Sequence, residues 1–326
     1  PDACKEAIIS VENFPTDMIA SLQASGDCFI DPYIGTYYLY LNCDKIEDWR
    51  VRAAMTISVD RENIVENVTQ GGQVPATGFV AAGITDSQGT DFSVGVSDLG
   101  ALYNALQQMY PDYDLSLYSE RCELAKELYQ AAVDDGTWDP STTVVYNFNT
   151  SDAHKAIAEA CGSDWQTVLG MNITLENQEW ATFLDTHKAG NYSIARNGWL
   201  GDYNDPISFL DMWTTASGNN DVQFGKGDNA KVAAYSLDLT DLGYDTKVAN
   251  GTWAETYDVI IKDIKTCTDT TTRYALMHRA EDLLMSTGCI CPIYYYTDLY
   301  MISDKVNGFF SSPLGYKYFM YCTVAE

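Results

Sequence analysis

The sequence has few basic residues, few histidines and no apolar stretch long enough to cross a bilayer. Its 326 residues include 19 Lys and Arg against 46 Asp and Glu, which gives a formal net charge of −27. This excess of negative charge argues against binding to nucleic acid and to anionic membrane surfaces. Only three histidines occur, and no four cysteines stand at zinc-ligand spacing. We therefore predict no metal site and no nucleic-acid partner.

Short motifs that mark catalytic or nucleotide-binding sites are also missing. The sequence contains no GxSxG, no GxGxxG and no P-loop. The stretch from Asp202 begins with calcium-loop spacing, but Ile207 replaces the required glycine and Trp213 the final glutamate. We therefore predict a protein without cofactors and without catalytic residues. A carboxylate-dependent hydrolase stays open as an alternative, because the 46 acidic residues offer many pairs.

What the sequence does contain is the composition of a folded, globular protein. Hydrophobic residues make up 46% and charged residues 20% of the chain, which excludes a disordered polypeptide. The nine cysteines are many for this length, and their odd number leaves at least one unpaired within the chain. We expect buried thiols with at most one or two disulfides of unassigned pairing. The chain starts at Pro1 without a signal peptide, so we expect a mature or trimmed fragment.

Apolar periodicity and capping residues predict alternating strands and helices. An aromatic strand is expected at 33–41, followed by helices that Asp48 and Asp60 cap. The stretch 73–118 is expected to be mainly loop, and Ser119 is expected to cap the next helix. Further on we expect strands at 143–148, 172–176, 192–197, 290–296 and 317–321, helices from Asp152, at 179–188 and at 270–286, a loop at 198–206, and a surface insertion near 226–252. This alternation predicts an α/β fold with a mixed sheet.

Several segments together resemble one known family. They are DPYIGTYYLYLN at 31–42, WRVRAAMTISVDRENIVENV at 49–68, PATGF at 75–79, NTSDAHKAIA at 149–158, NQEWATFLDTHKAGNYSIARNGWLGDYNDPISFLDMW at 177–213, AEDLLM at 280–285, CPIYYYTDLYM at 291–301 and SPLGYKYF at 312–319. In this order they resemble the oligopeptide- and dipeptide-binding proteins of ABC importers, the family-5 extracytoplasmic solute-binding proteins. The stretch ARNGWLGDYNDP at 195–206 is the most specific of them.

The resemblance implies a periplasmic-binding-protein-like (type II) lobe with a mixed sheet flanked by helices, plus partial segments of another lobe. Residues 1–38 would be a residual segment of the first lobe, 39–295 the second, ligand-binding lobe, and 296–326 a return to the first lobe. Most of the first lobe would be missing, so we expect the chain alone to bind peptide weakly or not at all.

The implied function is non-catalytic capture of short peptides and their delivery to the membrane permease of an ABC-type importer. The protein would be a monomer outside the cytoplasm of a bacterium, either a cell-surface lipoprotein or periplasmic. The same scaffold could instead bind a signalling peptide, a glycan or a metal chelate, which the sequence leaves open.

The resemblance also assigns the amino-terminal end of a bound peptide. Asp202 falls on the family's aspartate that holds the peptide amine through charge-assisted hydrogen bonds. The alternative for Asp202 is a turn-forming role, which Asp205 also fits. The segment Gly198, Trp199 and Leu200 is expected to pair with an extended peptide as an added strand. Gly198 would admit close backbone approach, and Trp199 would either wall a side-chain pocket or pack in the core.

Other candidates lie at the peptide's carboxyl end and along the cleft. Arg196 and His154 match family positions that meet the ligand's carboxylate, although Arg196 could instead pair with an acid of the protein. His187 stands where some family members carry arginine, which puts any one peptide length in doubt. The remaining candidates are Trp180 as a second pocket wall, Tyr296 lining the cleft or packing in the core, and Asn219 and Asn220 as loop donors to the peptide backbone.

Overall fold

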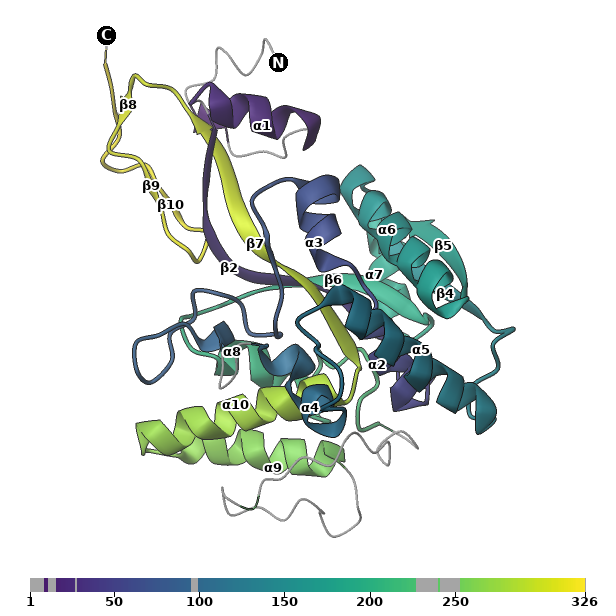
Figure 1. Ribbon diagram of the computed structural model, residues 1–326. Coiled ribbons are helices and arrows are strands. Elements are labelled where there is room, and N and C mark those ends of the chain that lie inside the picture. The colour runs from purple at the N-terminus through teal and green to yellow at the C-terminus, as the bar shows by residue number, and fades with distance from the viewer. Residues whose placement is uncertain are drawn as a thin grey trace.

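The computed structural model of the chain describes residues 9–10, 16–26, 28–94, 99–226, 240 and 253–325. A mixed β-sheet runs through it and is flanked by helices (Figure 1). The strand order is β1-β7-β2-β6-β4-β5, and β3 pairs with β7. These strands are β1 (Ile9–Ser10), β2 (Cys28–Leu41), β3 (Val74–Pro75), β4 (Thr143–Asn149), β5 (Asn172–Gln178), β6 (Ile194–Leu200) and β7 (Ile290–Ile302). The mixed α/β architecture is as predicted.

The sheet has an antiparallel part and a parallel part. β2 pairs antiparallel with β7 on one side and with β6 on the other. β4 runs parallel to β5 and to the start of β6, as a strand linked to its neighbour by a helix requires. β2 and β7 pass from the small upper part, which holds residues 16–24 and 303–325, into the larger lower part (Figure 1).

The helices form two groups. The first group, α2 (Trp49–Ile57), α5 (Tyr118–Asp134) and α6 (Asp152–Leu169), packs together and against the sheet. The second group packs around α10 (Thr270–Ser286) and consists of α4 (Ala101–Met109), α8 (Ile207–Leu210) and α9 (Trp253–Thr266). The shorter segments are α1 (Thr16–Ala24), α3 (Arg61–Asn63), η1 (Ile64–Thr69), η2 (Phe92–Val94), α7 (Trp180–Lys188) and η3 (Asp211–Trp213). Within the described ranges, no helix combines the length and apolarity that a membrane crossing needs.

Two of the three predicted helix caps are confirmed. The side chain of Asp48 accepts from the backbone N–H of Arg50, and that of Asp60 accepts from the N–H of Asn63. Such caps satisfy backbone donors that the first helical turn leaves open. The predicted cap at Ser119 is wrong, because α5 already begins at Tyr118. The loop before α5 therefore ends at Leu117, one residue before the end predicted at 118.

Three other element predictions need correction. The expected loop 73–118 contains α4, whose short apolar face (Leu102 and Leu106) is buried against α10. β6 continues to Leu200, into the expected loop 198–206. The strand expected at 317–321 is reduced to β10 (Lys317–Tyr318), paired with β9 (Phe310–Ser311). Apart from residues 226 and 240, the expected insertion near 226–252 lies outside the described residues.

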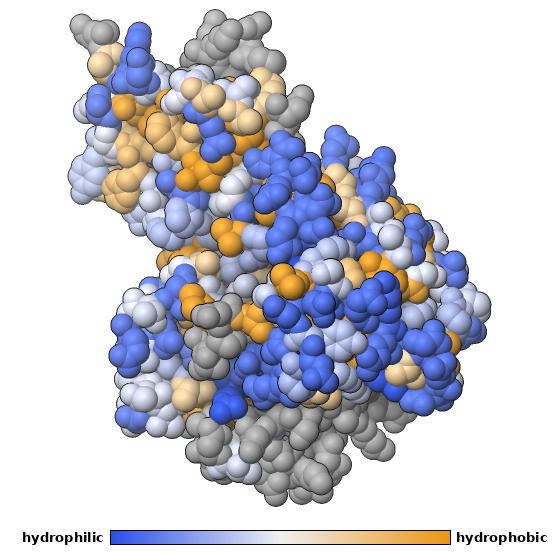
Figure 2. All heavy atoms as spheres, in the orientation of Figure 1, coloured by the Kyte–Doolittle hydropathy of each residue, from blue (hydrophilic) through white to orange (hydrophobic). Residues whose placement is uncertain are grey.

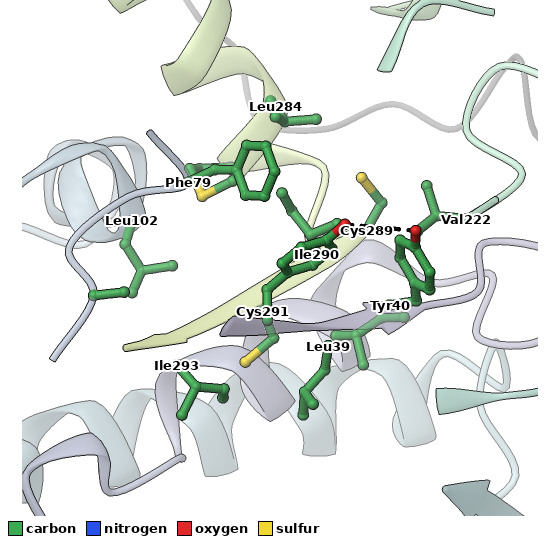
Figure 3. Close-up of a cluster of buried hydrophobic side chains, with 14 of the residues drawn as sticks. Leu39, Tyr40, Phe79, Leu102, Val222, Leu284, Cys289, Ile290, Cys291 and Ile293 are labelled. Atoms are coloured by element: carbon green, nitrogen blue, oxygen red, sulfur yellow. Dashed lines mark hydrogen bonds between the residues drawn. The ribbon is translucent and has the colours of Figure 1, made fainter. Parts of the chain in front are cut away.

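The centre of the core lies where β2 and β7 cross the lower part. Leu39, Tyr40, Ile290 and Ile293 are at most 1% exposed, and Figure 3 shows Leu39 and Ile293 on the side of the strands opposite to the buried Phe79. A strand that is covered on both faces shows a continuous apolar run in place of alternation. This explains why YIGTYYLYL reads as one aromatic block.

The upper part of the molecule is smaller and carries exposed apolar side chains. There β8 (Val306–Asn307) pairs with β11 (Thr323–Val324). Phe310, Phe319 and Met320 are 47%, 51% and 75% exposed. Figure 2 shows apolar surface gathered on this part and a narrowing of the outline below it. The lobe boundaries near 38 and 296 stay predictions.

All eight cysteines within the described residues have free thiols, and six of them are buried. The expectation of buried thiols is therefore confirmed for these residues. Cys4 lies outside the described residues.

Candidate functional site

The strand β6 has one backbone edge that is only partly used. β6 pairs with β2 along its whole length, from Ile194 to Leu200. On its other side it pairs with β4 only at Ile194 and Ala195. From Arg196 to Leu200 no strand among the described residues covers this edge. An uncovered edge offers backbone donors and acceptors to an extended chain, which would add as a further strand.

Gly198, in the middle of this edge, lies directly against Tyr296. A Cβ atom there would collide with the hydroxyl group of Tyr296. Gly35 on β2 has the same relation to the Tyr296 ring. The two glycines therefore make room for the tyrosine, which lies across β2 towards β6. The N–H of Gly198 donates to Asn197 Oδ1 at 2.7 Å.

Tyr296 belongs to a group of aromatic side chains on this face of the sheet. Its ring packs edge-on against Tyr37 at 6.2 Å and Tyr294 at 5.5 Å, and tilted against Tyr33 at 6.3 Å. Burial raises the pKa of Tyr296 to about 12, and the charge of Arg196 opposes that rise. Tyr296 is partly exposed, so its neutral hydroxyl can donate a hydrogen bond. It thus contributes both to packing and to the surface beside β6.

Arg196 lies at the other end of the uncovered edge and is held in place by neutral groups. Its Nε donates to Asn149 Oδ1 at 2.7 Å. Its guanidinium carbon lies 6.0 Å from the ring centre of Tyr37 and 5.9 Å from those of Trp180 and Phe183. The rings favour a cation at this point. No acidic residue pairs with Arg196 in the part of the chain that the structure describes, so its charge can meet an external anion.

His154 and Trp180 join Arg196. The hydroxyl of Tyr37 lies 3.4 Å from His154 Nδ1. Burial, and then the charge of Arg196, lowers the pKa of His154 to about 4, so its imidazole is neutral at neutral pH. Trp180 is 54% exposed and stacks on Phe183. Tyr37 and Asn149, which organise this group, were not recognised from the sequence, because their role depends on strand register.

Trp199 and Leu200 point to opposite faces of β6. The indole N–H of Trp199 donates to the backbone oxygen of Ser208 at 2.8 Å, and the ring packs against the core. This contact supports the core alternative for Trp199. Leu200 is 44% exposed and lies beside Gly35, on the face that carries Arg196. Because side chains alternate along a strand, those of Arg196 and Leu200 lie on the same face of β6.

Asp202 follows β6 and differs from the other polar residues of its loop. Asn204 exchanges two hydrogen bonds with Thr85. Asp205 forms a bidentate ion pair with Arg273 at 2.7 and 3.0 Å and accepts from the N–H of Ile207. The carboxylate of Asp202 is exposed, and no ion pair within the described ranges involves it. Asp205 therefore fixes the turn, as the alternative for this loop suggested.

Two other residues are placed inside the protein. Asn220 is fully buried, and its amide donates to the backbone oxygens of Trp213, Thr214 and Phe224. The side-chain amide of Asn220 is therefore not available to donate to a peptide as predicted, because it already holds its own loop through these three hydrogen bonds. His187 is 4% exposed, and burial lowers its pKa to about 3. No contact that joins the exposed Asn219 to Arg196 or Asp202 occurs among the described residues.

No group of three or more His, Cys, Asp or Glu side chains in the described ranges is arranged to hold a metal ion. The candidate site is an uncovered strand edge with Arg196 near one end and Asp202 beyond the other.

Comparison with known proteins identifies the family to which this chain belongs. Residues 5–221 match the family described as "Bacterial extracellular solute-binding proteins, family 5 Middle". The chain is 31% identical over 308 residues to the periplasmic oligopeptide-binding protein OppA of Salmonella typhimurium, covering 93% of this chain and 48% of OppA. It is 29% identical over 281 residues to the dipeptide-binding protein DppE of Bacillus subtilis, covering 86% and 43%. The chain spans about half the length of these relatives.

A solved structure agrees with the sequence relatives. The Escherichia coli murein tripeptide-binding protein MppA superimposes with a TM-score of 0.73 at 27% identity, covering 100% of this chain and 55% of MppA. The fold is therefore that of the type II periplasmic binding proteins, as predicted. The architecture defines an extracellular solute-binding protein. Within that class, the chain belongs to family 5 of the bacterial extracellular solute-binding proteins.

Proposed function

We propose that this chain is the peptide-contacting part of a protein that captures short peptides outside the bacterial cytoplasm and delivers them to the membrane permease of an ABC importer. The uncovered edge of β6 carries the proposal, because it lies between a cation and an anion. OppA and DppE are named for binding oligopeptides and dipeptides, which supports the same ligand class here. Capture involves no covalent step.

The chemistry of the two ends suggests the direction of the ligand. Asp202 would hold the peptide's ammonium group, and Arg196 would hold its carboxylate. The peptide would then run antiparallel to β6, and its backbone would pair with residues 196–200. Arg196 and Asp202 are six positions apart, which corresponds to roughly 20 Å of extended chain. That span fits a peptide of about five residues with its ends on these groups.

The proposed site is complete only with a second wall. We propose that residues 39–295 form one lobe and that 1–38 and 296–326 belong to the other. Closure of the two lobes would exclude water and strengthen both charged contacts. Trp180, Leu200 and Tyr296, which are exposed or partly exposed beside the edge, would then line pockets for the peptide's side chains.

Calorimetry on the full natural polypeptide that contains this chain tests the proposal. Alanine peptides of two to six residues would be compared in free and N-acetylated form. Acetylation removes the ammonium charge and should weaken binding at least about 30-fold, as expected for a lost charged hydrogen bond. Asp202→Asn should weaken the free peptide similarly and leave the acetylated peptide unchanged.

A matched control is Asp112→Asn, which alters an exposed acid between α4 and α5. This variant should bind both peptides like the parent. Equal affinity of the parent protein for free and acetylated peptides would show that Asp202 does not hold the amine. No binding of any alanine peptide would contradict the proposed ligand class.

A further inference from the structure

The backbone around Asp202 is held by hydrogen bonds to two different elements. The N–H of Gly201 donates to the backbone oxygen of Ile34 on β2 at 2.9 Å. The next N–H along the chain, that of Asp202 itself, donates to Oγ of Ser208 on α8 at 2.9 Å. Asp202 is nevertheless an exposed residue. The structure therefore fixes the backbone from which this aspartate projects and leaves the residue at the surface.

Ser208 makes two contacts of this kind, one with its side chain and one with its backbone. It is only 3% exposed. While its hydroxyl oxygen accepts from Asp202, its backbone oxygen accepts from the indole N–H of Trp199 at 2.8 Å. Both lengths are those of ordinary N–H···O hydrogen bonds. One buried residue thus joins α8 to β6, through Trp199, and to the backbone two residues beyond the end of that strand.

The short helix α8 is itself held by Asp205 and by α10, against which it packs (Figure 1). Asp205 Oδ1 accepts from the N–H of Ile207, the first residue of α8, and the backbone oxygen of Asp205 accepts from the N–H of Ser208, each at 3.0 Å. Arg273 of α10 donates to both carboxylate oxygens of Asp205. A bidentate pair of this kind fixes the relative orientation of its two groups. A continuous series of contacts therefore leads from α10 to the N–H of Asp202.

We infer that Ser208 is a positioning residue for the amino-terminal end of the bound peptide, and that Arg273 supports it by holding α8. The inference rests on the proposed function, in which Asp202 holds the peptide's ammonium group. Ser208 acts through Asp202, because its hydroxyl fixes the backbone that carries the carboxylate. A backbone that is ordered before the peptide arrives need not be ordered on binding, and this preorganisation increases affinity. The gain applies only to a peptide whose amine is charged.

Another buried serine provides a matched control. Ser286 is 1% exposed, and its hydroxyl donates to the backbone oxygen of Leu283 at 2.7 Å. Both residues belong to α10, so this hydrogen bond stays within one helix. Ser286→Ala and Ser208→Ala make the same chemical change at buried sites, and each removes one hydrogen bond. Only the second of these bonds involves the backbone of Asp202, so the two variants separate positioning from a general contribution to stability.

The test is calorimetry on the full natural polypeptide that contains this chain, with pentaalanine in free and N-acetylated form. Ser208→Ala should weaken binding of the free peptide about fivefold, as expected for the loss of one hydrogen bond, and leave the affinity for the acetylated peptide unchanged. The contact with Trp199 is retained in this variant, because it uses the backbone oxygen of residue 208. Ser286→Ala should bind both peptides like the parent.

Two further variants test whether Ser208 acts through Asp202. Asp202→Asn keeps the backbone N–H but removes the charge, so adding Ser208→Ala to it should weaken the free peptide no further. Arg273→Gln breaks the pair with Asp205 at a partly exposed position. It should reduce the preference for the free peptide in the same direction as Ser208→Ala, and it decides the question if Ser208→Ala does not fold.

The results that overturn the inference differ from those that overturn the proposed function. If the parent prefers the free peptide and Ser208→Ala keeps that preference in full, Ser208 does not position Asp202. An equal loss for both peptides, or additive effects of Ser208→Ala and Asp202→Asn, overturns the inference as well and leaves the proposed function intact. Equal affinity of the parent for the two peptides contradicts the role of Asp202, and this inference fails with it.

Discussion

The two ends of the uncovered edge of β6 are built in different ways. Arg196 is enclosed by three aromatic rings and fixed by Asn149. Asp202 is exposed, while its loop neighbours Asn204 and Asp205 are tied to Thr85 and Arg273. The described residues therefore preorganise the arginine itself, whereas at the aspartate they organise only the loop. In the proposed function, the carboxylate end is formed within this chain and the amine end is completed by lobe closure.

The largest expected effect comes from removing the enclosed cation. Arg196→Met keeps much of the apolar stem between the rings but removes the charge. Binding of free peptides to the full natural polypeptide should weaken by about 2–5 kcal/mol. Peptides with an amidated carboxyl end should bind the variant and the parent equally, as calorimetry would show. A similar loss for amidated peptides would mean that Arg196 supports the fold and does not read the carboxylate.

A smaller effect is expected in the middle of the edge. In Gly198→Ala the new methyl group would meet the Tyr296 hydroxyl, and the overpacking should destabilise the protein by about 1–3 kcal/mol. Chemical denaturation measures this loss. Tyr296→Phe removes the oxygen nearest to the new methyl, so the double variant should recover part of the stability. A neutral Gly198→Ala would contradict the close approach of Tyr296 to β6.

The smallest expected effect concerns pH at the arginine end. The pKa of His154 is lowered to about 4 from a usual value of 6.5, so the folded state binds fewer protons than the unfolded chain between these values. The stability that neutral His154 contributes is therefore present above pH 6.5 and is lost as the pH falls towards 4. After solvent screening the loss should be roughly 1–2 kcal/mol.

The measurement for His154 is a comparison of unfolding curves from pH 7 to pH 4. His154→Gln does not titrate, so its stability should fall less steeply than that of the parent protein. Parallel curves would show that His154 does not carry this pH dependence.

Much of the secondary structure could be predicted from local chemistry. Asp48 and Asp60 cap helices as expected, since a cap depends on neighbours within one helical turn. The missed helix α4 is short, and its apolar face is explained only by α10, which lies far away in the sequence. The same limit applies to Ser119, where a good capping residue lies just inside the helix. Local signals indicate that a helix is present more reliably than where it begins.

Some residues of the candidate site could be named from the sequence, and others could be recognised only in the structure. Arg196, His154 and Trp180 could be named from the sequence. The structure brings Trp180 to Arg196, and it brings Arg196 and His154 to Tyr37. The importance of Tyr37 and Asn149 could not be seen, because it depends on which strands pair and in which register. Asn220 was misjudged for the same reason: a loop asparagine looks available until its amide is found to bond three backbone oxygens.

The sequence by itself determined the α/β class, the resemblance to peptide-binding proteins and the identity of the two charged residues. These depend on local periodicity and on a specific run of residues, 195–206. Only the tertiary structure decided that β6 has an uncovered edge, that Gly198 makes room for Tyr296, and that Arg196 lies among the rings of Tyr37, Trp180 and Phe183. Each of these contacts joins segments far apart in the chain, and their distance is set by strand pairing and packing, which no local pattern encodes.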